Sequence, residues 1–147
     1  MKAIVLAAAA AILMTIAPAA AQQVYPNPYK VGDFWTVDEY HVKPGGGLKL
    51  ANDIANDWQK RQEFARSKGW IKSFMILQNP YPRENEPTIL LISVTDRLPT
   101  PDEVDARGVE MRAYLKKSGD QLQTMSANRA EYSTPGSLEL FRQWVKR

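Results

Sequence analysis

The sequence predicts an α+β domain whose helices pack on an antiparallel sheet. Two segments of the 147-residue chain repeat their apolar side chains with a helical period, and four shorter segments are rich in strand-forming residues. In chain order they are a strand at 34–42, a helix at 48–68, strands at 70–78 and 88–95, a helix at 101–130 and a strand at 137–145. A chain of this length is expected to form one domain with an adequate core.

The N-terminus has the pattern of an export signal. Lys2 precedes an apolar stretch from Ala3 to Ile16, and Ala19-Ala20-Ala21 follows Pro18. The stretch is shorter than the roughly 20 residues that cross a bilayer, and its Ala-x-Ala ending is typical of a cleavage site. We therefore expect residues 1–21 to be a signal peptide. The protein is expected to be periplasmic or secreted, with no integral membrane segment after the signal is removed.

The start of the mature chain is rich in proline and lacks a repeat. Residues 22–33, which include Tyr25-Pro26-Asn27-Pro28-Tyr29, predict an extended lead-in, and the domain proper is expected at 34–147. Its first strand ends at Pro44-Gly45-Gly46-Gly47. These glycines predict a tight turn into the first helix, because they lack the spacing of a phosphate-binding loop.

The first helix is predicted to be amphipathic. Gly69 stands where a left-handed residue ends a helix, after a basic last turn. The helix is expected to pack through one apolar side. That side consists of Ala51, Ile54, Ala55, Trp58 and Ala65.

The second half of the chain has clear signals for where strands and helices begin and end. A proline-rich connection at 79–87 separates two apolar segments, which predicts adjacent antiparallel strands. Thr100-Pro101-Asp102-Glu103 combines an N-cap, a proline at the first helical position and the glutamate of a capping box. The helix that begins there is expected to weaken at Ser118-Gly119-Asp120 and to end before Pro135-Gly136. The last strand is expected near a sheet edge.

The order β-α-β-β-α-β predicts a ferredoxin-like fold, with a four-stranded antiparallel sheet and two helices on one face. The free face of such a sheet is polar in a monomer. Here Leu90, Ile92 and Val94 lie on one face of a strand and Ile89 and Leu91 on the other, so both faces are apolar. We expect a homodimer in which two sheets enclose an α/β barrel. Alternatively, the second helix, the lead-in or the C-terminal residues cover the second face.

A family resemblance rests on the end of the first strand. The motif Tyr40-x-Val42-Lys43-Pro44-Gly45, followed by the order of elements above, resembles the dimeric α/β-barrel superfamily that includes NIPSNAP-like and EthD-like proteins and small cofactor-free monooxygenases. The chain also resembles a group of exported bacterial proteins that carry Trp58-Gln59-Lys60-x-Gln62-Glu63-Phe64-Ala65 and Gly69-Trp70-Ile71-Lys72. NIPSNAP-like strands often carry a Glu and an Arg before the tyrosine, where this chain has Thr36 and Asp38.

The first strand also supplies the candidate ligand-binding residues. Strand alternation gives two sets, Thr36, Asp38 and Tyr40 on one face and Trp35, Val37, Glu39 and His41 on the other. The resemblance implies that Thr36, Asp38 and Tyr40 face the space between the sheets and orient a small ligand there, and the alternative is a polar spot paired across the dimer. His41 is a candidate on the opposite face, with a hydrogen-bonded strand residue as the simpler interpretation. Which face lines the pocket stays open.

The composition excludes several function classes. Without cysteine, the chain has neither thiol chemistry nor disulfides. Its single histidine has no ligand cluster beside it, so no metal and no cofactor are expected. The formal net charge of +3 is interspersed along the chain instead of forming a basic stripe, so nucleic acid is not an expected partner.

The expected function is that of an exported homodimer that binds a small, mainly apolar molecule between its sheets, without an identified catalytic group. One alternative is a cofactor-free monooxygenase or isomerase that uses Asp38, Tyr40 or His41 inside the barrel. Another is a cell-envelope domain that binds other proteins. A cavity reached by Asp38 and Tyr40 favours ligand binding or catalysis, whereas a filled interior with an exposed apolar face favours the interaction domain.

Overall fold

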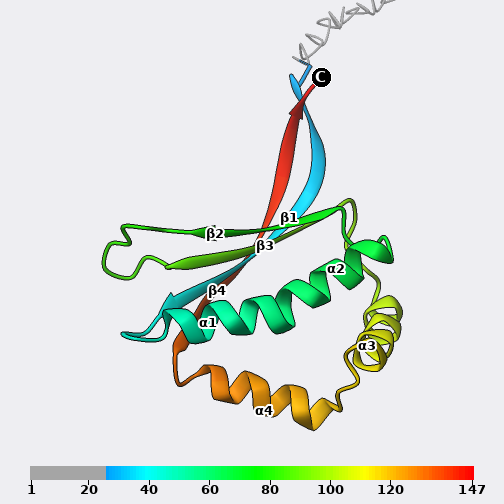
Figure 1. Ribbon diagram of the computed structural model, residues 1–147. Helices are drawn as coiled ribbons and strands as arrows, with labels where there is room; N and C mark the ends of the chain where they lie inside the picture. Colours follow the sequence, from blue (N-terminus) through cyan, green and yellow to red (C-terminus); the bar gives the residue numbers. More distant parts are fainter. Residues whose placement is uncertain (1–25) are drawn as a thin grey trace, which may run out of the picture.

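The computed structural model describes residues 26–147, so the expected signal peptide at 1–21 and the first residues of the lead-in lie outside the described residues. The described chain is a mixed α+β structure with an open four-stranded antiparallel sheet (Figure 1). Its strands are β1 (Tyr29–Val42), β2 (Ser73–Gln78), β3 (Ile89–Thr95) and β4 (Ser133–Lys146). Its helical segments are α1 (Gly47–Asp53), η1 (Ile54–Trp58), α2 (Gln59–Ser67), α3 (Pro101–Leu115) and α4 (Gly119–Arg129). Within residues 26–147, no helix has both the length and the apolar character required to cross a membrane.

The first strand of the chain lies inside the sheet and the last lies at its edge. The strand order is β2-β3-β1-β4, and every neighbouring pair is antiparallel. Val37 of β1 lies opposite Ile92 of β3 and Glu139 of β4. Ile76 of β2 lies opposite Leu91 of β3, which confirms the predicted adjacency of these two strands. The predicted edge position of the last strand is also confirmed.

β1 and β4 are longer than predicted. β1 begins at Tyr29, so residues 29–33 belong to the strand and not to an extended lead-in. β4 includes Pro135-Gly136, which was expected to precede the strand, and the β1–β4 ladder shifts register beside it. Proline is tolerated on edge strands and at bulges, and both conditions hold here. The ends of β1 and β4 project beyond the other strands as a two-stranded ribbon (Figure 1).

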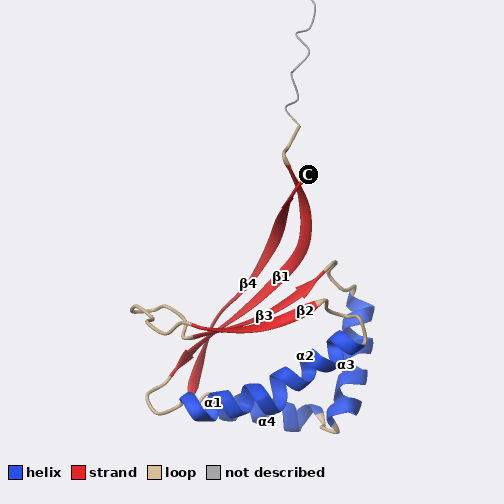
Figure 2. Ribbon diagram, turned by 45° about the horizontal axis from the view of Figure 1, so that its top comes forward, coloured by secondary structure: helices blue, strands red, loops and turns tan. Residues whose placement is uncertain are grey.

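All helices of residues 26–147 lie on one face of the sheet (Figure 2). The first predicted helix is one continuous rod, α1–η1–α2. Its middle is a π turn, in which the Gln59 N–H donates to the Ile54 carbonyl five residues earlier. The rod ends where predicted, at the left-handed Gly69 with φ +69°. We refer to the opposite, uncovered side of the sheet as the open face.

The single helix predicted at 101–130 is instead two helices. The capping box at Thr100 and Glu103 is confirmed as the start of α3. α3 ends at Leu115 and is followed by Lys116, whose φ of 52° is left-handed. Ser118 with Gln121 forms a second capping box that starts α4. The break therefore lies at the predicted weak point, where the Ser118 side chain caps a new helix and stabilises the interruption.

The core consists of one cluster on each face of the sheet. On the helix side, Leu50 and Ile54 of the rod pack against Leu91 of β3. On the open face, Val37 of β1 packs with Ile92 and Val94 of β3. The prediction that β3 is apolar on both faces is confirmed. Because α3 and α4 lie on the helix side, the second predicted helix does not cover the open face.

The glycine turn between β1 and α1 is tight, as predicted. Gly45 has a left-handed φ of +75°. A Cβ on Gly46 would lie 2.2 Å from the Tyr132 carbonyl oxygen, so only glycine fits there without a shift of the backbone. This turn fixes where the rod begins.

Candidate functional site

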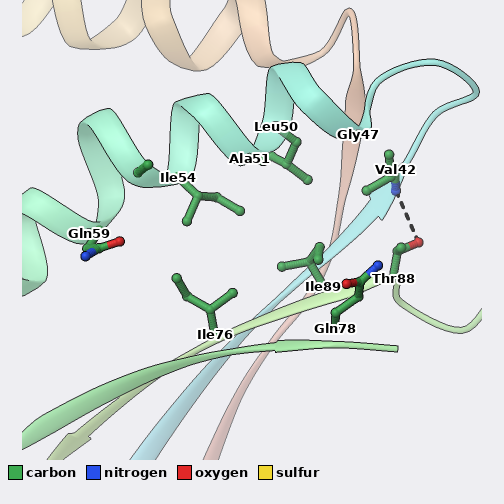
Figure 3. Close-up of a pocket in the computed structure, with 11 residues that line it drawn as sticks. Val42, Gly47, Leu50, Ala51, Ile54, Gln59, Ile76, Gln78, Thr88 and Ile89 are labelled. Carbon is green, nitrogen blue, oxygen red and sulfur yellow. Dashed lines mark hydrogen bonds between the residues drawn. The ribbon is translucent and has the colours of Figure 1, made fainter. Parts of the chain in front are cut away.

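An apolar pocket lies between the helical rod and the sheet (Figure 3). It has a volume of about 450 Å³. Ile54 of the rod and Ile76 of β2 point toward each other across it (Figure 3). We call it the sheet–helix pocket. Its lining residues are Val42, Gly47, Leu50, Ala51, Ile54, Ala55, Gln59, Ile76, Gln78, Thr88 and Ile89.

Small side chains on the rod create the space. Gly47, Ala51 and Ala55 follow one another at four-residue spacing and line the pocket. This spacing places them on one side of a helix. The bulkier Leu50 and Ile54 are buried against the sheet and form the inner wall. The predicted apolar side of the helix is therefore divided between core packing and pocket lining.

The polar groups of the sheet–helix pocket are neutral. They belong to Gln59, Gln78 and Thr88, and no charged side chain is among its lining residues. The Thr88 hydroxyl oxygen accepts a hydrogen bond from the Val42 N–H at 3.4 Å, which leaves the hydroxyl hydrogen for another acceptor (Figure 3). Two amides and one hydroxyl can orient a neutral polar atom on an otherwise apolar molecule.

The residues predicted to bind the ligand lie outside this pocket. Tyr40 packs with the Leu50, Ile54 and Leu91 cluster, so its set on β1 faces the helices. The expectation that Thr36, Asp38 and Tyr40 face away from the helices, toward a second sheet, is wrong. The face of a strand is set by its register with β3, which alternation alone leaves undetermined.

Asp38 and Tyr40 instead lie near Arg129 of α4. The Arg129 Nη1 group donates to the Tyr40 hydroxyl at 3.4 Å, and its guanidinium carbon lies 5.7 Å from the Tyr40 ring centre. Burial raises the pKa of Asp38, and the positive charge of Arg129 partly opposes this shift. The structure therefore brings two predicted site residues together with an arginine, at the junction of the sheet and α4.

His41 lies on the open face with Glu39. The Glu39 Oε2 atom accepts hydrogen bonds from the Ser137 hydroxyl at 2.5 Å and from the Ser137 N–H at 3.2 Å. These bonds lower the pKa of Glu39, and His41 adds a smaller effect in the same direction. A Cβ on Gly136 would lie 3.1 Å from the His41 Nε2 atom, so the His41 ring packs closely on β4.

The open face is apolar over much of its area. Leu77 is 46% exposed and Phe141 is 51% exposed. Phe141 lies opposite Trp35, and Leu77 lies opposite Leu90, so these side chains share the face of the Val37 cluster. Exposed apolar side chains that share one face are typical of interaction sites.

Sequence reasoning missed a group of charges between the rod and α4. The Asp57 side chain is buried, and its oxygens lie 2.6 Å from Arg61 Nη2 and 3.4 Å from Lys117 Nζ. Beside it, Asp53 Oδ2 lies 2.5 Å from Arg129 Nε. Only the four-residue spacing of Asp57 and Arg61 is visible in the sequence. Lys117, just before α4, is 60 positions from Asp57, and Arg129 of α4 is 76 positions from Asp53.

Within residues 26–147 there is no group of three or more side chains suited to hold a metal ion. Comparison with protein-family models, with curated proteins and with solved structures finds no match to this chain.

Proposed function

We propose that this protein binds a small, mainly apolar and uncharged molecule in the sheet–helix pocket. The observation that carries the proposal is a pocket of about 450 Å³ with an apolar wall and only neutral polar groups. Ligand pockets typically measure about 300–1,000 Å³ and combine an apolar lining with few polar groups. The proposed location is between the rod and the sheet, in place of the space between two sheets.

The polar groups of the pocket limit the ligand class. A charged molecule would lose its hydration and gain no opposite charge from Gln59, Gln78 or Thr88. A neutral molecule with one carbonyl or hydroxyl would find both donors and acceptors there. The proposed ligand is therefore an apolar body with a single neutral polar function.

Titration with a neutral fluorescent probe, N-phenyl-1-naphthylamine, tests this proposal. Ile76→Trp fills the pocket, and we expect it to weaken saturable probe binding at least tenfold. Leu77→Trp is the matched control, because Leu77 is the next residue of β2, is similarly exposed and points to the open face. Unchanged binding in Ile76→Trp, with native melting behaviour, would contradict a site in this pocket.

We further propose that two copies associate through the open face. Leu77 and Phe141 are exposed there, and the helices of residues 26–147 all lie on the other side (Figure 2). Identical faces pair readily about a twofold axis. Glu39 and Glu139 lie toward one end of this face, and Lys30 lies toward the other. Two copies that pack face to face in opposite directions would therefore bring unlike charges together.

The proposed dimer specifies how the α+β domain pairs with a second copy. The element order and the antiparallel sheet support a ferredoxin-like domain that pairs as a dimeric α/β barrel, in line with the family resemblance. Export remains part of the proposal on the leader pattern alone. A cell-envelope interaction domain that uses the same face for another protein is the alternative.

Light scattering coupled to size-exclusion chromatography tests the dimer. Leu77→Arg is expected to convert a dimer to a monomer and to leave probe binding unchanged. Leu48→Arg is the control, since Leu48 is 76% exposed on α1. A compact wild-type monomer at micromolar concentration would contradict the dimer and leave the ligand proposal standing.

A further inference from the structure

A second cavity lies between the η1–α2 part of the rod and α4, outside the sheet–helix pocket. It has a volume of about 160 Å³. We call it the interhelix cavity. It is lined by Asp57, Trp58, Arg61, Leu122, Met125, Ser126 and Arg129. We propose that this cavity binds a small organic carboxylate, with its carboxylate on the arginines and its apolar body against Trp58 and Met125.

Unused hydrogen-bond donors of Arg61 point to an anion. A guanidinium has five N–H donors. The Arg61 Nη2 atom lies 2.6 Å from Asp57 Oδ2, whereas its Nε atom is buried and has no hydrogen-bond partner within residues 26–147. Buried donors normally have partners, so this unpaired N–H shows that the protein does not satisfy the Arg61 guanidinium completely.

Arg129 also has donors to spare. Its Nε atom donates to Asp53 at 2.5 Å and its Nη1 atom to the Tyr40 hydroxyl at 3.4 Å. The Tyr132 side chain is a further hydrogen-bond neighbour of this guanidinium. A guanidinium has five N–H donors, so these contacts do not use all of them. Ser126 adds a hydroxyl to the same wall. Arginine pairs favourably with carboxylates because its planar donors match two carboxylate oxygens.

The balance of charge at the cavity favours one negative charge. Arg61, Arg129 and Lys117 carry positive charges, and Asp57 and Asp53 pair with them. Among the residues that line the cavity, Arg61 and Arg129 are positive and Asp57 is negative, so its wall carries one excess positive charge. Asp38 also lies near Arg129, on the side of the sheet, and burial raises the pKa of its carboxyl.

The remaining wall is apolar and selects an organic anion over a fully hydrated one. Trp58, Leu122 and Met125 line the cavity together with its charged groups. A water molecule in the liquid takes up about 30 Å³, so the cavity has the room of about five waters. An aromatic carboxylate combines a charge for the arginines with a flat apolar body for this wall.

A titration with sodium benzoate followed by the indole N–H signals in ¹H–¹⁵N NMR tests the proposal. We expect the Trp58 signal, assigned with Trp58→Phe, to shift saturably while the Trp144 signal stays in place. Acetate is expected to bind more weakly and inorganic phosphate not to saturate. Absence of a saturable Trp58 shift with benzoate, or saturation by phosphate alone, would overturn the proposal.

Two variants give the matched comparison. Arg61→Gln is expected to weaken benzoate binding at least tenfold, whereas Lys60→Gln removes the same charge from the next, exposed residue and should leave binding unchanged. Equal weakening in both would indicate only long-range attraction and overturn the site. If Arg61→Gln fails to fold, Ser126→Asp places a carboxylate in the cavity, and unaltered binding in that variant would also overturn it. Ile76→Trp should not affect benzoate, so this test is independent of the sheet–helix pocket.

Discussion

The two helical layers of this molecule are attached to the rest of it in different ways. The rod α1–η1–α2 buries Leu50, Ile54 and Ala65, and the first two belong to the core cluster on the sheet. The helices α3 and α4 contain no buried residue. Burial of apolar side chains thus attaches the first layer to the sheet. The second layer is attached through side chains that stay partly exposed.

Ion pairs are among the contacts that attach the second layer. Glu110 of α3 lies 2.6 Å from Lys68, and Arg129 of α4 lies 2.5 Å from Asp53. One aromatic contact is added where Tyr114 stacks on Phe64 with ring centres 4.2 Å apart. Regions with few buried apolar contacts open at low free energy, and salt screens exposed charges. We therefore expect α3 and α4 to open before the rod does.

The largest effect is expected at the apolar anchor of the rod. Leu50→Ala removes the most buried leucine of the helix side and should lower the free energy of unfolding by about 2–5 kcal/mol. Leu48→Ala, two residues earlier and largely exposed, should change it by less than about 0.5 kcal/mol. Urea denaturation followed by circular dichroism measures both. Similar losses in the two variants would mean that the rod is not anchored through Leu50.

A smaller and more local effect is expected where the second layer is attached. Asp57→Asn removes the carboxylate shared by Arg61 and Lys117, and because both cations are partly exposed we expect a cost of about 1–3 kcal/mol. Hydrogen exchange should accelerate in α4 and the end of α3 more than in the rod. Asp105→Asn on the exposed surface of α3 is the control. Uniform acceleration across the fold would remove the distinction between the layers.

The turn between β1 and α1 allows a comparison of two neighbouring glycines, Gly46 and Gly47. Gly46→Ala forces a Cβ against the Tyr132 carbonyl, next to the end of α4, and should cost about 1–3 kcal/mol. At Gly47, within α1, a Cβ meets open space, so Gly47→Ala should stabilise by about 0.5–1 kcal/mol. Thermal unfolding of the two variants decides this. A neutral Gly46→Ala would show that the junction adapts.

The smallest effect concerns the start of α3 and depends on pH. The bidentate contact with Arg97 and the hydrogen bond from the Thr100 N–H lower the pKa of Glu103 to about 2. Its contribution to stability is therefore fully present above the ordinary pKa of 4.5 and is lost as the pH falls from there through 2. Glu103→Gln should flatten the acid limb of the unfolding profile in that range. Glu84→Gln, in the exposed β2–β3 loop, should leave the slope unchanged.

The sequence was sufficient for features that depend on local chemistry. The capping box at Thr100, the left-handed Gly69 and the apolar alternation of β3 were predicted because each depends on neighbours within a few residues. The ends of β1 and β4 were not predicted, because Tyr29 becomes strand only through pairing with Lys146 at the far end of the chain. Pro135 was misread for the same reason.

The candidate site was predicted less well than the fold. Tyr40 and Asp38 were placed on the wrong side because alternation gives two faces and only the packed helix decides which is which. The sheet–helix pocket depends on where the small residues Ala51 and Ala55 meet Ile76, and the interhelix cavity on a contact between η1 and α4. Distances between segments of this kind leave no periodic trace in a sequence.

The pairing of β1 with β4 also bears on the order in which the chain folds. The N–H of Arg147, the last residue, donates to the carbonyl of Pro28, and β1 has β3 on one side and β4 on the other. Closing a loop that spans almost the whole domain costs entropy that local contacts do not repay. Until β4 has paired, β1 lacks one of its two neighbours. We therefore expect completion of the sheet to be a late step of folding, and until then one edge of a strand that is central in the finished sheet stays unpaired.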